Sequence, residues 1–209
     1  IRDLVRSRGL GDVYKRQPSR NVDFYLDFAR EKKVRIIKTF ETHLQADYIA
    51  GSRMIAERTG AGFLANEEDF AGARIAYTRL ENNETYSFTA GGPEVRALFT
   101  PGHTPGSTTY LIDDRYLVTG DTVFITSIGR PDLGGKAEEW AALLFNTMNK
   151  IKKMDRKLIV LPGHFMDWEE ADSRLMFECT LGEALDRNRS IYEIDTAVSY
   201  THLRAHETV

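Results

Sequence analysis

Apolar and polar positions follow two different periods along the chain, which predicts helices separated by short strands. Apolar residues three and four apart from Val22 to Lys32 and from Ala137 to Lys153 predict two amphipathic helices. Further helices are predicted over 51–58 and 171–188. Short apolar runs predict strands at 34–39, 62–65, 95–99, 108–112, 116–119 and 157–161. This mixture favours a layered α/β fold whose functional site lies at the strand ends.

Turn-forming residues separate the predicted strands. Asn82-Asn83 and Gly91-Gly92 predict hairpin turns, and Asp113-Asp114 predicts a hairpin that joins 108–112 to 116–119. Asp121–Gly135 is a long segment interrupted by glycines. A loop of that length in a compact domain indicates a functional role.

Length, charge and cysteine content restrict the class of protein. A chain of 209 residues with 42% apolar content can bury one sizeable core, so we expect one domain. The net charge of −3 gives no electrostatic case for binding nucleic acid or a membrane surface. No apolar run approaches the ~20 residues that span a bilayer. The lone Cys179 excludes an internal disulfide framework and fits the reducing cytoplasm.

The two ends of the chain do not continue the hydrophobic periodicity of their neighbours. Residues 1–17 and 197–209 resemble translated sequencing-adapter segments, so we interpret both as non-native and exclude them from fold reasoning. The folded domain is then expected to span 18–196 and to be incomplete at both ends. On this interpretation His202 and His206, spaced like metal ligands on a helix, are accidental.

Three of the five histidines lie in short polar motifs that follow predicted strands. The motifs are Thr42-His43-Leu44-Gln45-Ala46-Asp47-Tyr48, Pro101-Gly102-His103-Thr104-Pro105-Gly106 and Leu161-Pro162-Gly163-His164, with Thr119-Gly120-Asp121-Thr122 as a fourth piece. Imidazole offers one good lone pair, and an aspartate adds the negative charge that holds a divalent cation. These residue types at the ends of successive strands predict a metal site.

The ordered set His43-x-Gln45-x-Asp47-Tyr48, His103, Gly120-Asp121 and Gly163-His164 resembles the metallo-β-lactamase superfamily over nearly all of 18–196. The motifs around His43, His103 and Asp121 are similar to those of glyoxalase II and the persulfide dioxygenases. The loop Ile128–Leu133 resembles that of bacterial persulfide dioxygenases and their rhodanese-fused relatives. The resemblance implies an α/β, four-layer αββα fold with the metal at one edge of the sheets. It also implies that a first β-hairpin, ending at Pro18-Ser19-Arg20, is truncated.

Two positions depart from the family motif His-x-His-x-Asp-His, because this chain has Gln45 and Tyr48 where the second and third histidines belong. Glutamine offers only a neutral amide, and tyrosine coordinates well only as the phenolate, whose unperturbed pKa is ~10. Each half of a two-zinc hydrolase centre has therefore lost a ligand. A mononuclear Fe(II) site of the dioxygenase type needs, by resemblance, only His43, His103 and Asp121.

The resemblance thus implies one Fe(II) per chain and the oxidation of a low-molecular-weight thiol persulfide by O2 to sulfite and thiol. His43, His103 and Asp121 are the expected metal ligands and catalytic residues. The groups expected around them, which orient the ligands or the substrate sulfur, are Gln45, Asp47, Tyr48 and His164. Arg130 is the candidate for binding a substrate carboxylate, and an ion pair with Asp132 that fixes the loop is the alternative.

Two other functions stay open at this point. One is a zinc thioesterase of the glyoxalase II type, which would use metal-activated hydroxide. The other is a catalytically inactive relative that binds a thiol or a partner. The thiol carrier (glutathione, coenzyme A or another), a homodimer and a fused rhodanese domain in the full gene are also left open.

Overall fold

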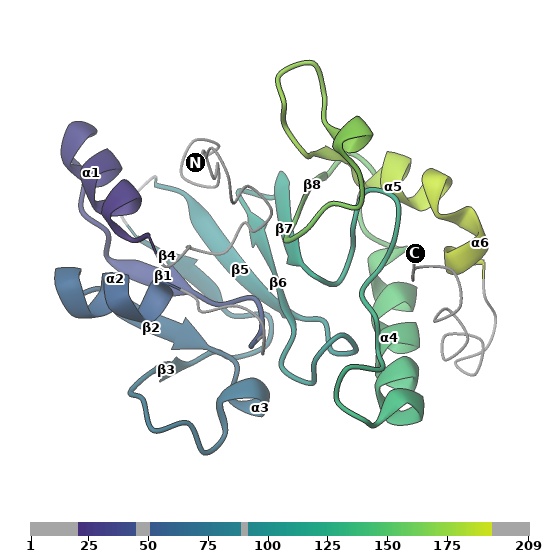
Figure 1. Ribbon diagram of the computed structural model, residues 1–209, viewed down its shortest axis with the longest axis horizontal. Helices are drawn as coiled ribbons and strands as arrows, with labels where there is room; N and C mark the ends of the chain where they lie inside the picture. The colour runs from purple at the N-terminus through teal and green to yellow at the C-terminus, as the bar shows by residue number, and fades with distance from the viewer. Residues whose placement is uncertain (1–20, 45–50, 89–91, 194–209) are drawn as a thin grey trace.

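The computed structural model describes residues 21–44, 51–88 and 92–193. Within these ranges two β-sheets pack face to face, and helices cover the outer face of each sheet (Figure 1). Gln45, Asp47 and Tyr48 lie outside the described residues, as do the terminal segments 1–17 and 197–209. The expectations for these positions therefore stay predictions.

The first sheet is small and parallel. Its strands, in the order β1-β2-β3, are β1 (Lys38–Phe40), β2 (Gly62–Ala65) and β3 (Thr78–Arg79). Its helices, at the left of Figure 1, are α1 (Asp23–Glu31), α2 (Ser52–Thr59) and α3 (Glu67–Phe70). Phe63 and Ala65 of β2 pack against Ala56 of α2 and Phe70 of α3, so these two helices cover the outer face of the sheet.

The second sheet forms the centre of the molecule. Its strands, in spatial order, are β4 (Thr85–Ser87), β5 (Glu94–Phe99), β6 (Thr108–Ile112), β7 (Tyr116–Gly120), β8 (Ile159–Pro162) and β9 (Cys179–Thr180). Neighbouring strands are antiparallel except β7 and β8, which are parallel. At the right of Figure 1 lie α4 (Ala137–Ile151), α5 (Leu181–Arg187) and α6 (Arg189–Tyr192), and a 3₁₀ turn spans Trp168–Glu170.

Strand β6 shows how the layers are joined, because all five of its residues are buried. Successive side chains of a strand point to opposite faces. Tyr110 and Ile112 accordingly join the cluster between the two sheets, which includes Leu64 of β2. Leu111 joins the cluster on the other face, which includes Leu144 of α4. The order helix, sheet, sheet, helix confirms the predicted four-layer αββα fold.

Several predicted elements are confirmed. Helix α4 and the strands β2, β5, β6, β7 and β8 lie where the hydrophobic pattern places them, within one or two residues. The hairpin between β6 and β7 turns at Asp113 and Asp114, whose φ angles of 52° and 46° are the left-handed values that such a turn requires. Helix α2 ends at Gly60, whose φ of 73° is also left-handed.

Three predictions were wrong in detail. The strand predicted over 34–39 begins only at Lys38, where pairing with β2 starts, and Val34 and Ile37 are 51% and 41% exposed. Asn82-Asn83 does not form a hairpin turn, because the strands on either side of it, β3 and β4, belong to different sheets. The helix predicted over 171–188 begins only at Leu181, since the two residues before it form β9 and pair with β8.

Helix α5 has a clear physical start. The Thr180 hydroxyl accepts a hydrogen bond from the Glu183 amide, and the Glu183 carboxylate accepts one from the Thr180 amide. This capping box satisfies backbone groups that a helix leaves unpaired at its first turn. Among the described residues, none of the helices combines the length and the apolar character that crossing a bilayer requires.

Candidate metal centre

The polar motifs converge at one edge of the second sheet. His103 follows β5, Asp121 follows β7 directly and His164 follows β8. These three strands run in the same direction, since β5 and β7 are both antiparallel to β6 and β8 is parallel to β7. Their carboxyl ends therefore meet at the same edge. His43 comes from the other sheet, three residues after the end of β1.

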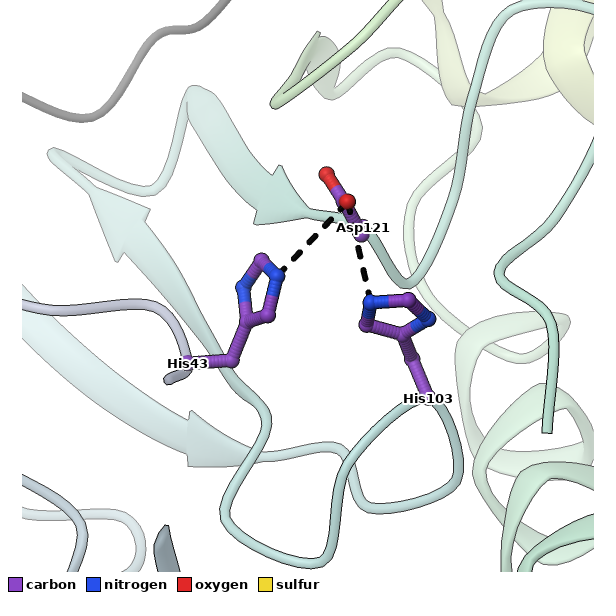
Figure 2. Close-up of side chains that lie close together, drawn as sticks. All are labelled: His43, His103 and Asp121. Carbon is purple, nitrogen blue, oxygen red and sulfur yellow. Dashed lines mark ion pairs between the residues drawn. The ribbon is translucent and has the colours of Figure 1, made fainter. Parts of the chain in front are cut away.

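Two imidazoles face one carboxylate oxygen at this edge (Figure 2). Nε2 of His43 lies 3.6 Å from Oδ2 of Asp121, and Nε2 of His103 lies 3.7 Å from the same oxygen. The three potential ligand atoms all lie within 4.8 Å of one another. Each of the three residues is only 5% exposed. Two nitrogen donors and one anionic oxygen at these separations fit a single divalent cation.

The remote ring nitrogens of the histidines have partners that orient the rings. Nδ1 of His103 lies 3.1 Å from the backbone carbonyl oxygen of Arg130. Because a carbonyl only accepts, Nδ1 carries the proton and the lone pair of Nε2 points toward Asp121. Nδ1 of His43 lies 2.9 Å from the Thr42 hydroxyl. Such contacts to the second nitrogen are typical of metal-binding histidines.

Burial and neighbouring charges favour the ligand forms of these groups. The pKa of His103 is lowered to about 4, first by burial and then by the nearby His43, so its imidazole is neutral at pH 7. Burial alone would raise the pKa of the Asp121 carboxyl. Hydrogen bonds and charge from His164 and His43 outweigh burial and hold that pKa well below its usual range. Asp121 is therefore an anion throughout the neutral range.

Glycines allow the backbone to approach these ligands closely. A Cβ at position 163 would lie 2.4 Å from Oδ1 of Asp121, and one at position 129 would lie 2.0 Å from the Asp121 carbonyl oxygen. Gly102 has φ +144°, and a Cβ there would lie 2.5 Å from Cα of Leu144 on α4. The His103 loop is thus packed directly on the helix, which only glycine at position 102 allows.

His164 and Arg130, which were also predicted as site residues, are not among the three converging groups. Nδ1 of His164 lies 2.7 Å from Oδ1 of Asp121, so His164 contacts the oxygen that the other two histidines do not face. The Arg130 guanidinium makes two contacts with Asp132, at 3.0 and 2.8 Å. This is the ion pair that was the alternative to substrate binding. The backbone carbonyl of Arg130, which orients the His103 ring, is a functional group that nothing in the sequence pattern predicted.

Comparisons with known proteins show which family this chain is similar to. The sequence model of the Metallo-beta-lactamase superfamily matches residues 9–164. A hydroxyacylglutathione hydrolase of Acidiphilium cryptum is 35% identical over 123 residues, which cover 59% of this chain and 48% of that protein. The chain therefore spans about half the length of this relative.

Two solved structures show the same fold. A metallo-beta-lactamase from Staphylococcus aureus has a TM-score of 0.79 at 25% identity, with 92% of this chain and 60% of that chain covered. ETHE1 from Myxococcus xanthus has a TM-score of 0.71 at 23% identity, with 90% of this chain and 76% of that chain covered.

Proposed function

The chain belongs to the metallo-β-lactamase superfamily, and we propose that it is a mononuclear-iron enzyme that oxidises a low-molecular-weight thiol persulfide. One observation carries the proposal: Nε2 of His43, Nε2 of His103 and Oδ2 of Asp121 converge as a set of three donors. Within the described ranges, these three form the one group of three or more potential ligands at metal-binding separations. Two histidines and one carboxylate are typical of non-haem Fe(II) oxygenases.

The sequence supports one metal more than two. Gln45 and Tyr48 stand where a dinuclear centre needs histidines. His164, which would serve a second metal, directs Nδ1 to Oδ1 of Asp121 at 2.7 Å. In a mononuclear site this contact has a sufficient role, since it holds the carboxylate so that Oδ2 faces His43 and His103.

The proposed reaction is balanced without a further reductant. Persulfide, O2 and water give thiol, sulfite and two protons: the outer sulfur is oxidised by four electrons, the S–S bond breaks, and O2 is reduced. Fe(II), held by His43, His103 and Asp121, would supply open positions and the electron transfer that lets O2 react with the sulfur. The residues of the chain would orient the ligands and, being buried, limit the access of water.

Arg130 stays our candidate for binding a carboxylate of the thiol carrier. Its Nε and Nη2 contact Asp132, but a guanidinium carries five N–H donors and can be shared between two carboxylates. The Arg130 side chain is 49% exposed, whereas that of Asp132 is 5% exposed. The ion pair would therefore hold the guanidinium in place for a substrate that approaches from solvent.

Metal content and O2 consumption together test the proposed function. The whole chain is purified without added metal and analysed for iron and zinc, and O2 uptake is followed with glutathione persulfide and coenzyme A persulfide. We expect about one iron per chain and O2 uptake with at least one of the two substrates. His43→Ala should lose both the iron and the O2 uptake, and turnover retained in that variant would overturn the iron assignment.

A second candidate function is a zinc-dependent thioesterase. It is favoured by the 35% identity to the hydroxyacylglutathione hydrolase of Acidiphilium cryptum. It predicts two zinc ions per chain and thioester hydrolysis that proceeds without O2. If that result is found, Gln45 and Tyr48 do not prevent a two-metal centre. A chain that takes up no metal would instead belong to the non-catalytic binding class.

A further inference from the structure

One carboxylate outside the metal site connects the two loops that carry its histidines. Oδ2 of Asp69 accepts hydrogen bonds from the Leu44 amide at 2.9 Å and from the Thr104 hydroxyl at 2.7 Å. Oδ1 accepts a third from the Gly106 amide at 2.7 Å. Leu44 and Thr104 are the residues that directly follow His43 and His103.

The local structure around α3 places Asp69 between these loops. The Asn66 side chain caps the helix by accepting a hydrogen bond from the Glu68 amide. Phe70, the next residue after Asp69, is buried and packs edge-on against Phe63 of β2, with ring centroids 5.8 Å apart. The side chain of Asn66 also reaches Thr108 at the start of β6. The carboxylate is therefore held by packing on one sheet and contacts a loop of the other.

The approach of Asp69 to the His103 loop is close. A Cβ at position 106 would lie 2.5 Å from Cγ of Asp69 and 2.7 Å from its backbone nitrogen. Only glycine at position 106 leaves room for this contact. The three hydrogen bonds and the absence of a side chain at Gly106 are separate features, and both serve the same junction.

We propose that Asp69 is a positioning residue that fixes the His43 loop relative to the His103 loop and so sets the geometry of the metal site. Hydrogen bonds to a carboxylate are stronger than those between neutral groups. Loops that are ordered before the metal arrives bind it more tightly, because less conformational freedom is lost on binding. The proposal rests on the metal site of the proposed function, but on neither the identity of the metal nor the reaction.

The test is metal affinity, measured without any substrate. Zn(II) affinity is obtained by competition with a chromophoric chelator, and the visible spectrum of the Co(II) form reports the coordination geometry. Asp69→Asn keeps the size of the side chain but replaces one accepting oxygen with an NH2 group, which cannot accept from these donors. We expect Zn(II) affinity to fall about 10- to 100-fold, as for other residues that orient ligands, and the Co(II) spectrum to change.

The chain offers a matched control and a graded variant. Asp113 also accepts a hydrogen bond from a distant backbone amide, that of Glu94 at 2.8 Å, but at the opposite end of β6 from the metal site. Asp113→Asn should leave Zn(II) affinity and the Co(II) spectrum unchanged. Thr104→Val removes one of the three contacts of Asp69 and should lower affinity less than Asp69→Asn does.

The outcomes separate this proposal from the proposed function. If Asp69→Asn binds Zn(II) as tightly as the parent protein with the same Co(II) spectrum, Asp69 is not a positioning residue, even if the variant melts at a lower temperature. A parent protein that binds no metal would overturn both proposals. A parent protein that binds metal, loses affinity with Asp69→Asn and consumes no O2 with either persulfide would overturn the dioxygenase function alone.

Discussion

His164 and Asp121 form a direct contact in which Nδ1 of the imidazole lies 2.7 Å from Oδ1 of the carboxylate. The two ligand histidines approach the other oxygen, Oδ2. The two oxygens of Asp121 thus face different histidines, and in the proposed site one would orient the carboxylate and the other would bind the metal. We propose that this division of the two oxygens belongs to a site for one metal, in which the carboxylate does not bridge two ions.

Replacing His164 tests this division of roles. In a mononuclear site, His164→Ala removes a hydrogen bond to the carboxylate but no ligand, so about one metal per chain should remain, bound about 10- to 100-fold more weakly. Elemental analysis and chelator competition measure both quantities, and His43→Ala, which removes a ligand, serves as the reference. A change from two metals to one in His164→Ala would contradict the mononuclear site.

The Thr42 hydroxyl should matter through its contact with Nδ1 of His43, at 2.9 Å. Thr42→Val has nearly the same shape but no hydroxyl, so the His43 ring loses its orienting partner, and we expect metal affinity to fall about 10-fold or more. Thr42→Ser keeps the hydroxyl and should retain most of the affinity. Equal losses in the two variants would mean that packing of the Thr42 methyl group, and not the hydrogen bond, is responsible.

Gly163→Ala should disturb the site by steric contact alone. The added Cβ would lie 2.4 Å from Oδ1 of Asp121, so the carboxylate or the backbone must move. We expect weaker metal binding and a loss of about 1–3 kcal/mol in the free energy of unfolding, measured by urea denaturation. Gly62→Ala is the control, since its Cβ would have no neighbour closer than 3.7 Å. If both variants behave alike, close packing at Gly163 is not the cause.

The pKa of the Cys179 thiol is raised from 9.0 to about 11, chiefly because the thiol is buried. At pH 8 the folded protein should therefore hold about 100-fold less thiolate than the unfolded chain, and alkylation should be slower by at least that factor. Because the folded pKa is raised, this group contributes stability below pH 9 that is lost as the pH rises toward 11. Cys179 is the one cysteine of the chain, so the alkylation rate reports on it alone.

Much of the fold could be predicted because its signals are local. The Asp113-Asp114 turn and the apolar stripe of α4 depend on residues close in sequence, and both are where the pattern places them. The meeting of His103 and Asp121 was also accessible, since both follow strands of one direction that end at one edge of a sheet. His43 follows a strand of the other sheet, and the resemblance to a known family placed it with them. The resemblance to a known family added the layer order.

The structural features that the sequence did not predict depend on contacts between residues far apart in the chain. Nothing near Asn82-Asn83 indicates that the chain passes from one sheet to the other at that point. Cys179 and Thr180 form a strand because β8 lies beside them, although their neighbours favour a helix. Asp69 lies 25 residues from Leu44 and 35 from Thr104, and no spacing rule joins them.

The metal ligands come from both sheets, because His43 follows β1 while His103 and Asp121 follow β5 and β7. A bound ion would therefore act as a cross-link between the two halves of the sandwich, present only in the folded state. By mass action, a ligand at 100 times its dissociation constant adds about 2.7 kcal/mol to the free energy of unfolding. The lifetime of this protein in a cell would then depend on the supply of metal as well as on its sequence.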